Sequence, residues 1–198
     1  MGGKLFKNFS FLSATLSFFI LIGIFAVLFS YAQEALHEFG IDFLYNETWE
    51  VDEDDEGGII GGFVPIIGTL LSTLIAMVIA TPLAMGIAIF LTEIATEKLV
   101  KPVSIAIELL AAIPSIIYGM WGLFYFAPSV QSTVGGNGVG LLTAGIVLAI
   151  MIIPFMAAIT RDAMNTVPPV LKESAYAMGA TKFEVIKDVV MPYAKGGI

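Results

Sequence analysis

The sequence predicts an all-α fold, a polytopic membrane helix bundle. Of the 198 residues, 58% are hydrophobic and 13% are charged. The mean hydropathy of +0.92 exceeds what the surface of a water-soluble domain tolerates. Four apolar segments are also long enough for a helix to cross about 30 Å of hydrocarbon, which takes roughly 20 residues. The chain has no cysteine, so disulfide frameworks and cysteine-based metal or redox chemistry are excluded.

Four membrane spans are expected, at residues 9–31, 66–91, 103–127 and 139–160. The first follows Lys4 and Lys7 but is longer than the apolar core of a signal peptide, so we expect a retained helix. The second apolar stretch begins already at Ile59 and is too long for one upright helix. Glycines and Pro65 predict a bend or short surface element at 57–65, with the span after it.

The basic residues all fall on one side of this four-span arrangement. They are Lys4, Lys7, Lys98, Lys101, Arg161, Lys172, Lys182, Lys187 and Lys195. The opposite loops, 32–65 and 128–138, contain none. Because Lys and Arg near the ends of spans stay on the cytoplasmic side, we expect the amino terminus in the cytoplasm.

Acidic residues concentrate in the first outer loop, where ten of the 17 in the chain lie between Glu34 and Glu56. We interpret the cluster 52–56 as a solvated charge run; the alternative is a cation site or a contact with a basic patch on an extracellular partner. The net charge of −8 argues against a nucleic-acid partner. The chain divides into an amino-terminal helix with its acidic loop, 1–56, and a larger helical domain, 57–198.

No motif of an enzyme active site is present. The sequence lacks the GxxxxGK[ST] phosphate loop, the HExxH zinc motif and the GxSxG nucleophile motif. His37 is the one histidine and has no second ligand at a helical or hairpin spacing. We therefore expect no catalytic residues and no metal site.

The third span carries a narrow stripe of small or polar residues at helical spacing. Its members are Ser104, Glu108, Ala111, Ser115, Gly119 and Gly122. Small residues let helices approach closely, so packing against a partner helix is the simpler interpretation, and lining a solute path is the alternative. Three prolines within spans, Pro82, Pro114 and Pro154, each remove a backbone hydrogen bond and can bend a helix.

Glu108 is the one residue with a charged side chain inside a predicted span. A carboxylate in hydrocarbon is costly, which makes Glu108 a candidate for a gating or pathway role. It lies about 8 Å into the span at 1.5 Å per residue, where headgroups, water or an inner-loop lysine reach it. A structural or interfacial role is therefore an equal alternative.

Two short helices are expected after the fourth span. Pro168 and Pro169 suit the first turn of a helix, and Gly179 suits a left-handed helix end. Thr181 and Glu184 then form a capping box that opens a second helix. On that helix the apolar residues Phe183, Ile186, Val189 and Val190 are predicted to share one face until Pro192. This cytoplasmic elbow has a shape that fits a groove of another protein.

Residues 166–192 resemble the EAA loop of ABC importer permeases, whose pattern is EAA-x3-G-x9-I-x-L-P. The matching residues are Glu173, Ser174, Ala175, Gly179, Val189, Met191 and Pro192. In that family the loop joins the fourth and fifth of six spans and docks into a cleft of a cytoplasmic ATPase. The resemblance implies that Glu173 fixes the first helix in that cleft, Ala175 allows close approach, Gly179 forms the bend and Val189 packs beneath.

The segments 63–93, 114–128 and 160–181 resemble PstC-type phosphate permeases. This resemblance implies phosphate as the solute, a PstA-like second permease, a PstB-like ATPase dimer that binds ATP and Mg, and a PstS-like binding protein outside the cell. The chain itself would bind no cofactor. It also implies two further spans, so the 198-residue chain is expected to be incomplete at its carboxyl end and unable to transport as it stands.

Two alternatives to phosphate import stay open at this point. A sister permease would carry sulfate, molybdate or another oxyanion, or an organic solute. A protein of another class would be a membrane interaction protein that keeps the elbow without transport. None of the outer-facing or span residues is a basic anion ligand, so phosphate follows from the resemblance alone.

Overall fold

The computed structural model describes residues 2–50 and 59–197, and nearly all of these residues are helical. Strand structure among them is confined to β1 (Trp49–Glu50) and β2 (Ile59–Ile60), which pair antiparallel. The predicted all-α class is confirmed. The chain forms two compact units, Met1–Ile67 and Gly68–Ile198, each of which is described by itself. The acidic cluster 52–56 and the domain boundary predicted after residue 56 lie outside the described residues.

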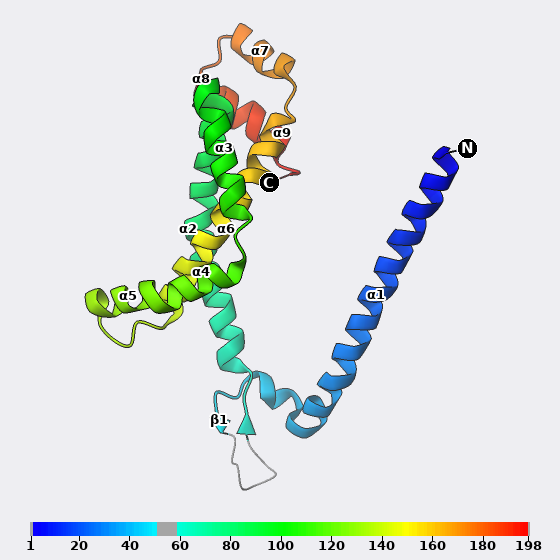
Figure 1. Cartoon of the computed structure of the whole chain (residues 1–198), viewed down its shortest axis with the longest axis vertical. Helices are drawn as coiled ribbons and strands as arrows, with labels where there is room; N and C mark the ends of the chain where they lie inside the picture. The colour runs from blue at the N-terminus through cyan, green and yellow to red at the C-terminus, as the bar shows by residue number, and fades with distance from the viewer. Residues whose placement is uncertain (1, 51–58, 198) are drawn as a thin grey trace. The chain divides into compact units, whose positions relative to one another are not determined.

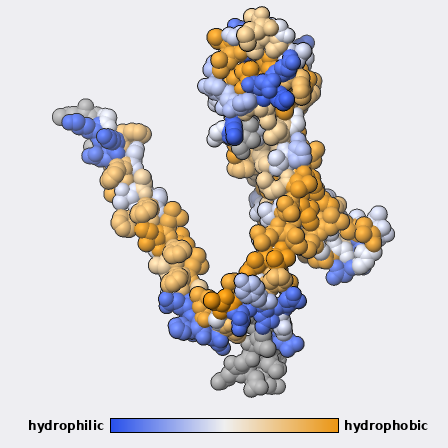
Figure 2. All heavy atoms as spheres, turned by 180° about the vertical axis from the view of Figure 1, so that it is seen from behind, coloured by the Kyte–Doolittle hydropathy of each residue, from blue (hydrophilic) through white to orange (hydrophobic). Residues whose placement is uncertain are grey.

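The amino-terminal unit consists of α1 (Gly2–Phe39), the 3-10 helix η1 (Gly40–Leu44), the two strands and the start of α2. The helix α1 is longer than the span predicted at 9–31 because regular helix continues into the flanking polar residues. Figure 2 shows apolar side chains over the middle of α1 and hydrophilic ones near its two ends. This distribution matches a helix whose middle lies in hydrocarbon.

A close turn leads into α2 (Phe63–Ile89), as predicted for the described part of 57–65. A Cβ on Gly61 would lie 2.0 Å from the carbonyl oxygen of Asn46, so only glycine fits there. The amide of Gly61 donates to the Thr48 carbonyl at 2.8 Å. The helix begins at Phe63, three residues earlier than predicted, because Pro65 falls in the first turn, where proline is tolerated.

The carboxyl-terminal unit is built around α2, α3 (Glu97–Ala111) and α6 (Leu141–Asn165), which run side by side in Figure 1. The helix α2 continues into a π turn, η2 (Phe90–Ile94). Buried alanines recur every four residues along α2: Ala76, Ala80, Ala84 and Ala88. Together with Ala149 and Ala157 of α6 they form the contact between the two helices. Small side chains allow this close packing.

The third predicted span, 103–127, is not one continuous helix but a bent pair of helical runs. The helix α3 ends at Ala111, and the chain bends by 83° before the next helical run, Ser115–Val134. That run comprises α4 (Ser115–Trp121), the π turn η3 (Gly122–Phe126) and α5 (Ala127–Val134). Pro114 lies at the break, where its missing N–H and restricted neighbour end α3. In contrast, α2 and α6 continue through Pro82 and Pro154.

The break also divides the stripe predicted along the third span. Glu108 lies on α3, whereas Ser115, Gly119 and Gly122 lie on the helical run after the bend. A hydrogen bond from the Tyr118 hydroxyl to the Leu110 carbonyl, 2.9 Å long, spans the bend. The described helices provide three spans by length and composition, or four when the bent pair counts as one.

Candidate functional site

The elbow follows α6 and has the predicted form of two short helical segments joined at Gly179. The first is α7 (Pro169–Ala177). The second consists of α8 (Lys182–Glu184), the π turn η4 (Val185–Val190) and α9 (Met191–Ala194). Gly179 between them has φ +88°, in the left-handed region that favours glycine. Figure 1 shows α7 and α8 at one end of the bundle of α2, α3 and α6.

The second segment opens with the predicted capping box, which fixes its starting direction. The Thr181 amide donates to Glu184 Oε2 at 2.7 Å, and the Glu184 amide donates to Thr181 Oγ1 at 3.4 Å. The Thr181 backbone N–H, followed by its hydroxyl, lowers the pKa of the Glu184 carboxyl below its ordinary value. A lowered pKa means that this cap stabilises the fold above the ordinary carboxyl pKa and loses its contribution as the pH falls.

A small apolar core attaches the elbow to the bundle. Its buried residues are Ala88, Met164, Val167, Ala175, Val185, Val190 and Ala194. The predicted apolar face of the second segment is wrong at Phe183, which is exposed, and it omits Val185, which is buried. The π turn η4 changes the angular spacing of its side chains, so a 3.6-residue period misplaces them.

The residues of the EAA-like pattern divide between this core and the outer surface. Ala175 is buried, and Val189 and Met191 are half-buried. The others are exposed: Glu173, Ser174, Gly179 and Pro192. Beside the bend lie two large exposed apolar side chains, Met178 at 86% and Phe183 at 71% exposed. Sequence reasoning gave Met178 no surface role, although its place directly before the bend glycine was a usable signal.

A hollow of about 420 Å³ lies at the bend and is lined by residues of both segments of the elbow. It is lined by Ala175, Met178, Gly179, Ala180, Glu184, Val185, Asp188 and Val189. Its lining combines apolar side chains, the exposed Met178 among them, with the carboxylates of Glu184 and Asp188. The surface of the elbow thus carries two exposed apolar side chains and a recess.

An ion pair that the sequence did not reveal joins the elbow to η2. Lys172 Nζ of α7 donates to Glu93 Oε1. The Glu93 side chain is 7% exposed and that of Lys172 22%. Glu93 lies two residues beyond the predicted end of the second span, at residue 91. The helical turn continues to Ile94 and turns the carboxylate inward.

Glu108 is also paired, with Arg161 of α6 and not with an inner-loop lysine. Arg161 Nη2 donates to Glu108 Oε1 at 3.1 Å and to Asp162 Oδ1 at 2.8 Å. The Arg161 side chain is 13% exposed, whereas that of Glu108 is 58% exposed. The pair therefore links α3 to α6, and the guanidinium is its shielded member.

Replacing Arg161 is expected to destabilise the protein more than replacing Glu108. The variant Arg161→Gln leaves two carboxylates without their cation, whereas Glu108→Gln leaves Arg161 bound to Asp162. Because Glu108 is largely exposed, its pair contributes at most about 1 kcal/mol. Thermal unfolding of the purified protein in detergent measures the loss of stability in both variants. The control is Lys101→Gln, on the exposed side of α3. A larger loss for Glu108→Gln than for Arg161→Gln would show a role beyond this pair.

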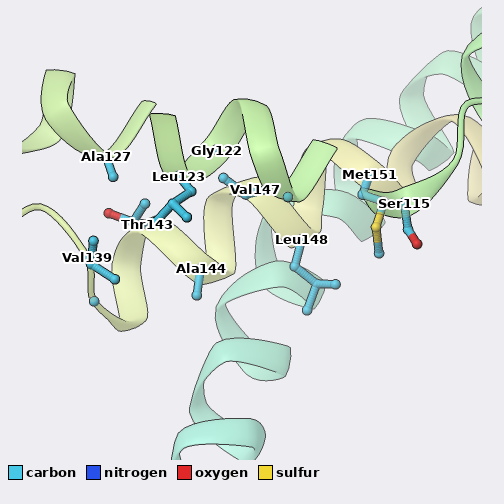
Figure 3. A pocket seen from close by; sticks show the side chains of 12 residues that line it. Ser115, Gly122, Leu123, Ala127, Val139, Thr143, Ala144, Val147, Leu148 and Met151 are labelled. Atoms are coloured by element: carbon cyan, nitrogen blue, oxygen red, sulfur yellow. The ribbon is translucent and has the colours of Figure 1, made fainter. Parts of the chain in front are cut away.

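Ser115 and Gly119 line an apolar hollow of about 330 Å³ between α4, α5 and α6, shown in Figure 3. Gly122 is buried against α6, and a Cβ on it would lie 2.7 Å from Val147 Cγ2. Gly122 is thus a packing residue, whereas a Cβ on Gly119 would meet no atom within 4 Å. A pathway role for Ser115 and Gly119 stays a prediction.

Comparison with known proteins relates the whole chain to transport permeases. A phosphate transport system permease protein PstC of Haemophilus influenzae is 47% identical over 215 residues, covering 98% of this chain and 67% of that protein. Its counterpart in Mesorhizobium japonicum is 45% identical, covering 94% of this chain and 62% of that protein. The chain thus spans about two thirds of the length of these relatives.

A solved structure shares the fold of a large part of the chain. The MetNI methionine ABC transporter in an inward-facing conformation matches with a TM-score of 0.52 at 29% identity, covering 67% of this chain and 60% of that chain. The family described as "Binding-protein-dependent transport system inner membrane component" matches residues 2–198. Its members are membrane transport components and not enzymes, which agrees with several apolar helices in one chain. The chain belongs to this family of inner-membrane components of binding-protein-dependent transport systems.

Proposed function

We propose that this chain is the transmembrane permease subunit of an ATP-driven ABC importer whose solute is inorganic phosphate. The elbow is the observation that supports the coupling role. Its two segments are set by Gly179, fixed by the capping box and attached to α2 and α6 by a buried core. The names of the PstC relatives support phosphate as the solute.

The outer surface of the elbow is the contact with a cytoplasmic ATPase in this proposal. Met178 and Phe183 insert into an apolar cleft of the ATPase, since both are large, apolar and exposed. Glu173 and Ser174 lie exposed on α7 and supply polar contacts at the rim. ATP and Mg bind to the ATPase, and this chain binds no cofactor.

The assembled importer contains three further kinds of partner. A PstA-like permease completes the membrane pathway, a PstB-like ATPase dimer binds the elbows, and a PstS-like protein delivers phosphate from outside. The family description and the likeness to an ABC transporter support an ATPase and a binding protein as partners. The choice of Pst-type partners follows from the PstC relatives.

The amino terminus and the elbow face the cytoplasm in this proposal. Lys98 and Lys101 lie in the first turns of α3, close after η2, which contacts the elbow through Glu93. These lysines and those of the elbow are therefore at one end of the carboxyl-terminal unit. A basic end is expected on the cytoplasmic side of the membrane.

Reconstitution of the assembled transporter tests the proposed function. We expect ATP-dependent accumulation of radioactive phosphate in proteoliposomes that contain the full-length permease, its PstA-like partner permease, its ATPase and its binding protein. Excess unlabelled sulfate, molybdate or methionine is expected to leave this accumulation unchanged. Accumulation of one of these other solutes and not of phosphate would overturn the choice of substrate, and the absence of all ATP-dependent uptake would overturn the transport role.

A further inference from the structure

The ion pair between Lys172 and Glu93 connects two parts of the chain that are 79 residues apart. Three ion pairs are present among the described residues, and Glu93 is the most buried carboxylate in any of them. A shielded charge is costly unless it is paired and hydrogen-bonded. The Glu93 carboxylate therefore holds Lys172 more firmly than a surface partner would.

The contact between the elbow and α2 contains one interaction with a preferred direction, the ion pair between Lys172 and Glu93. The elbow follows α6 directly in the chain, so the link to α6 is covalent. The link to α2 is non-covalent and consists of apolar contacts around Ala88 together with the ion pair. Apolar contacts have no preferred direction and allow sliding. A charge-assisted hydrogen bond fixes the register between two elements.

The surroundings of Glu93 connect it to α6 as well. The preceding residue, Thr92, donates its hydroxyl to the Ala88 carbonyl at 3.0 Å and contacts the sulfur of the buried Met164 at 3.7 Å. Both Thr92 and Glu93 belong to the π turn η2, a local distortion that occurs often at functional sites. The end of α2 is thus held between α6 and the elbow.

The neighbouring residues Lys172 and Glu173 face different ways on α7. Successive residues of a helix differ by about 100° around its axis. The Lys172 side chain is directed to the shielded Glu93, whereas Glu173 is exposed on the outer surface. A force applied to the outer face of α7 therefore reaches η2 through the adjacent residue.

We propose that Glu93 and Lys172 are positioning residues that make α2 follow the elbow when the ATPase moves it. The inference rests on the proposed function, because it assigns the elbow to an ATPase. Loss of either charge leaves the other shielded and unpaired, and the elbow then moves without α2. The amount of phosphate taken up per ATP hydrolysed is expected to fall about fivefold or more, the lower end of usual coupling between sites.

The test compares charge-removing and charge-exchanging variants in the assembled transporter. We expect Glu93→Gln and Lys172→Gln each to lower the ratio of uptake to hydrolysis, and the double exchange E93K/K172E to restore most of it. The controls Glu97→Gln and Lys98→Gln remove exposed charges four and five residues beyond Glu93 and should leave the ratio unchanged. A purely structural role would lower the amount of folded protein without changing the ratio.

A distance measurement separates this inference from the proposed function. Because the chain has no cysteine, cysteines introduced at the exposed Thr96 and Ala177 carry spin labels without further changes. We expect a narrow distance distribution in the otherwise unchanged protein, a broader one in Glu93→Gln and a narrow one again in E93K/K172E. If the unchanged transporter takes up no phosphate, the proposed function is overturned, and the distance measurement still tests the inference. An unchanged ratio, or an unchanged distance distribution in Glu93→Gln, overturns the inference.

Discussion

Valine at position 179 is expected to lower ATP-driven phosphate uptake about tenfold or more, which corresponds to about 1.4 kcal/mol of lost coupling. Gly179 has φ +88°, and left-handed backbone costs other residues about 1–2 kcal/mol, with a β-branched side chain among the least tolerated. A Cβ there would meet no atom within 4 Å, so the effect comes from the backbone and not from crowding. The angle between α7 and α8 then changes, and both Met178 and Phe183 move from their places.

Capture of the ATPase by the detergent-solubilised permease measures this effect directly. Gly179→Val is expected to lose capture, whereas Gly179→Asn is expected to keep most of it because asparagine tolerates positive φ. Both variants should reach the membrane in normal amounts, since the position is exposed. Equal capture by Gly179→Val and the unchanged protein would contradict the docking role of the elbow.

Valine at position 145 is expected to destabilise the bundle by about 1–3 kcal/mol, the usual effect of overpacking. Gly145 of α6 is buried against α2, where a Cβ would lie 2.6 Å from Ile75 Cγ2 and 3.3 Å from the Ser72 carbonyl oxygen. The two helices must separate to admit the side chain. Separation also weakens the alanine contacts that continue along the same helices.

The matched control for this substitution is Gly86→Val, on the exposed side of α2. A Cβ at Gly86 would meet no atom within 4 Å, so the same residue change adds no overlap there. Thermal unfolding in detergent is expected to show a clear loss for Gly145→Val and little change for Gly86→Val. Equal unfolding temperatures for the two variants would show that α2 and α6 do not pack in this way.

The elements that the sequence predicts well are those whose cause is local. The helices α2 and α6 follow from long apolar runs, which require no knowledge of neighbours. The form of the elbow follows from Gly179, Thr181 and Glu184, whose effects act within a few residues. The apolar face of the second segment is predicted less well, because the π turn η4 departs from the 3.6-residue period of an α-helix.

The sequence does not distinguish the sharp break in the third predicted span from the mild bend that a proline usually causes within a helix. Pro82 and Pro154 lie inside continuous helices, whereas Pro114 lies at a sharp bend. Each of the three prolines lacks the backbone N–H that would make a helical hydrogen bond. The residue type alone therefore does not distinguish a continuous helix from a sharp bend. The difference depends on contacts around the bend, such as the hydrogen bond from Tyr118 to Leu110.

The ion pairs of the site were missed because their partners are distant in the chain. Glu93 and Lys172 are 79 residues apart, and Glu108 and Arg161 are 53 apart. The sequence shows each charge but not which helix faces it. Glu93 was further hidden by the expected end of the second span at residue 91, since a carboxylate in a loop needs no partner.

The 83° bend also sets where the aromatic residues after it lie in the bilayer. The run Ser115–Val134 measures about 30 Å at 1.5 Å per residue. When α3 lies along the membrane normal, the two ends of this run differ in depth by only about 4 Å. Trp121, Phe124 and Tyr125, which line one surface hollow, then occupy nearly one depth along a line parallel to the membrane plane.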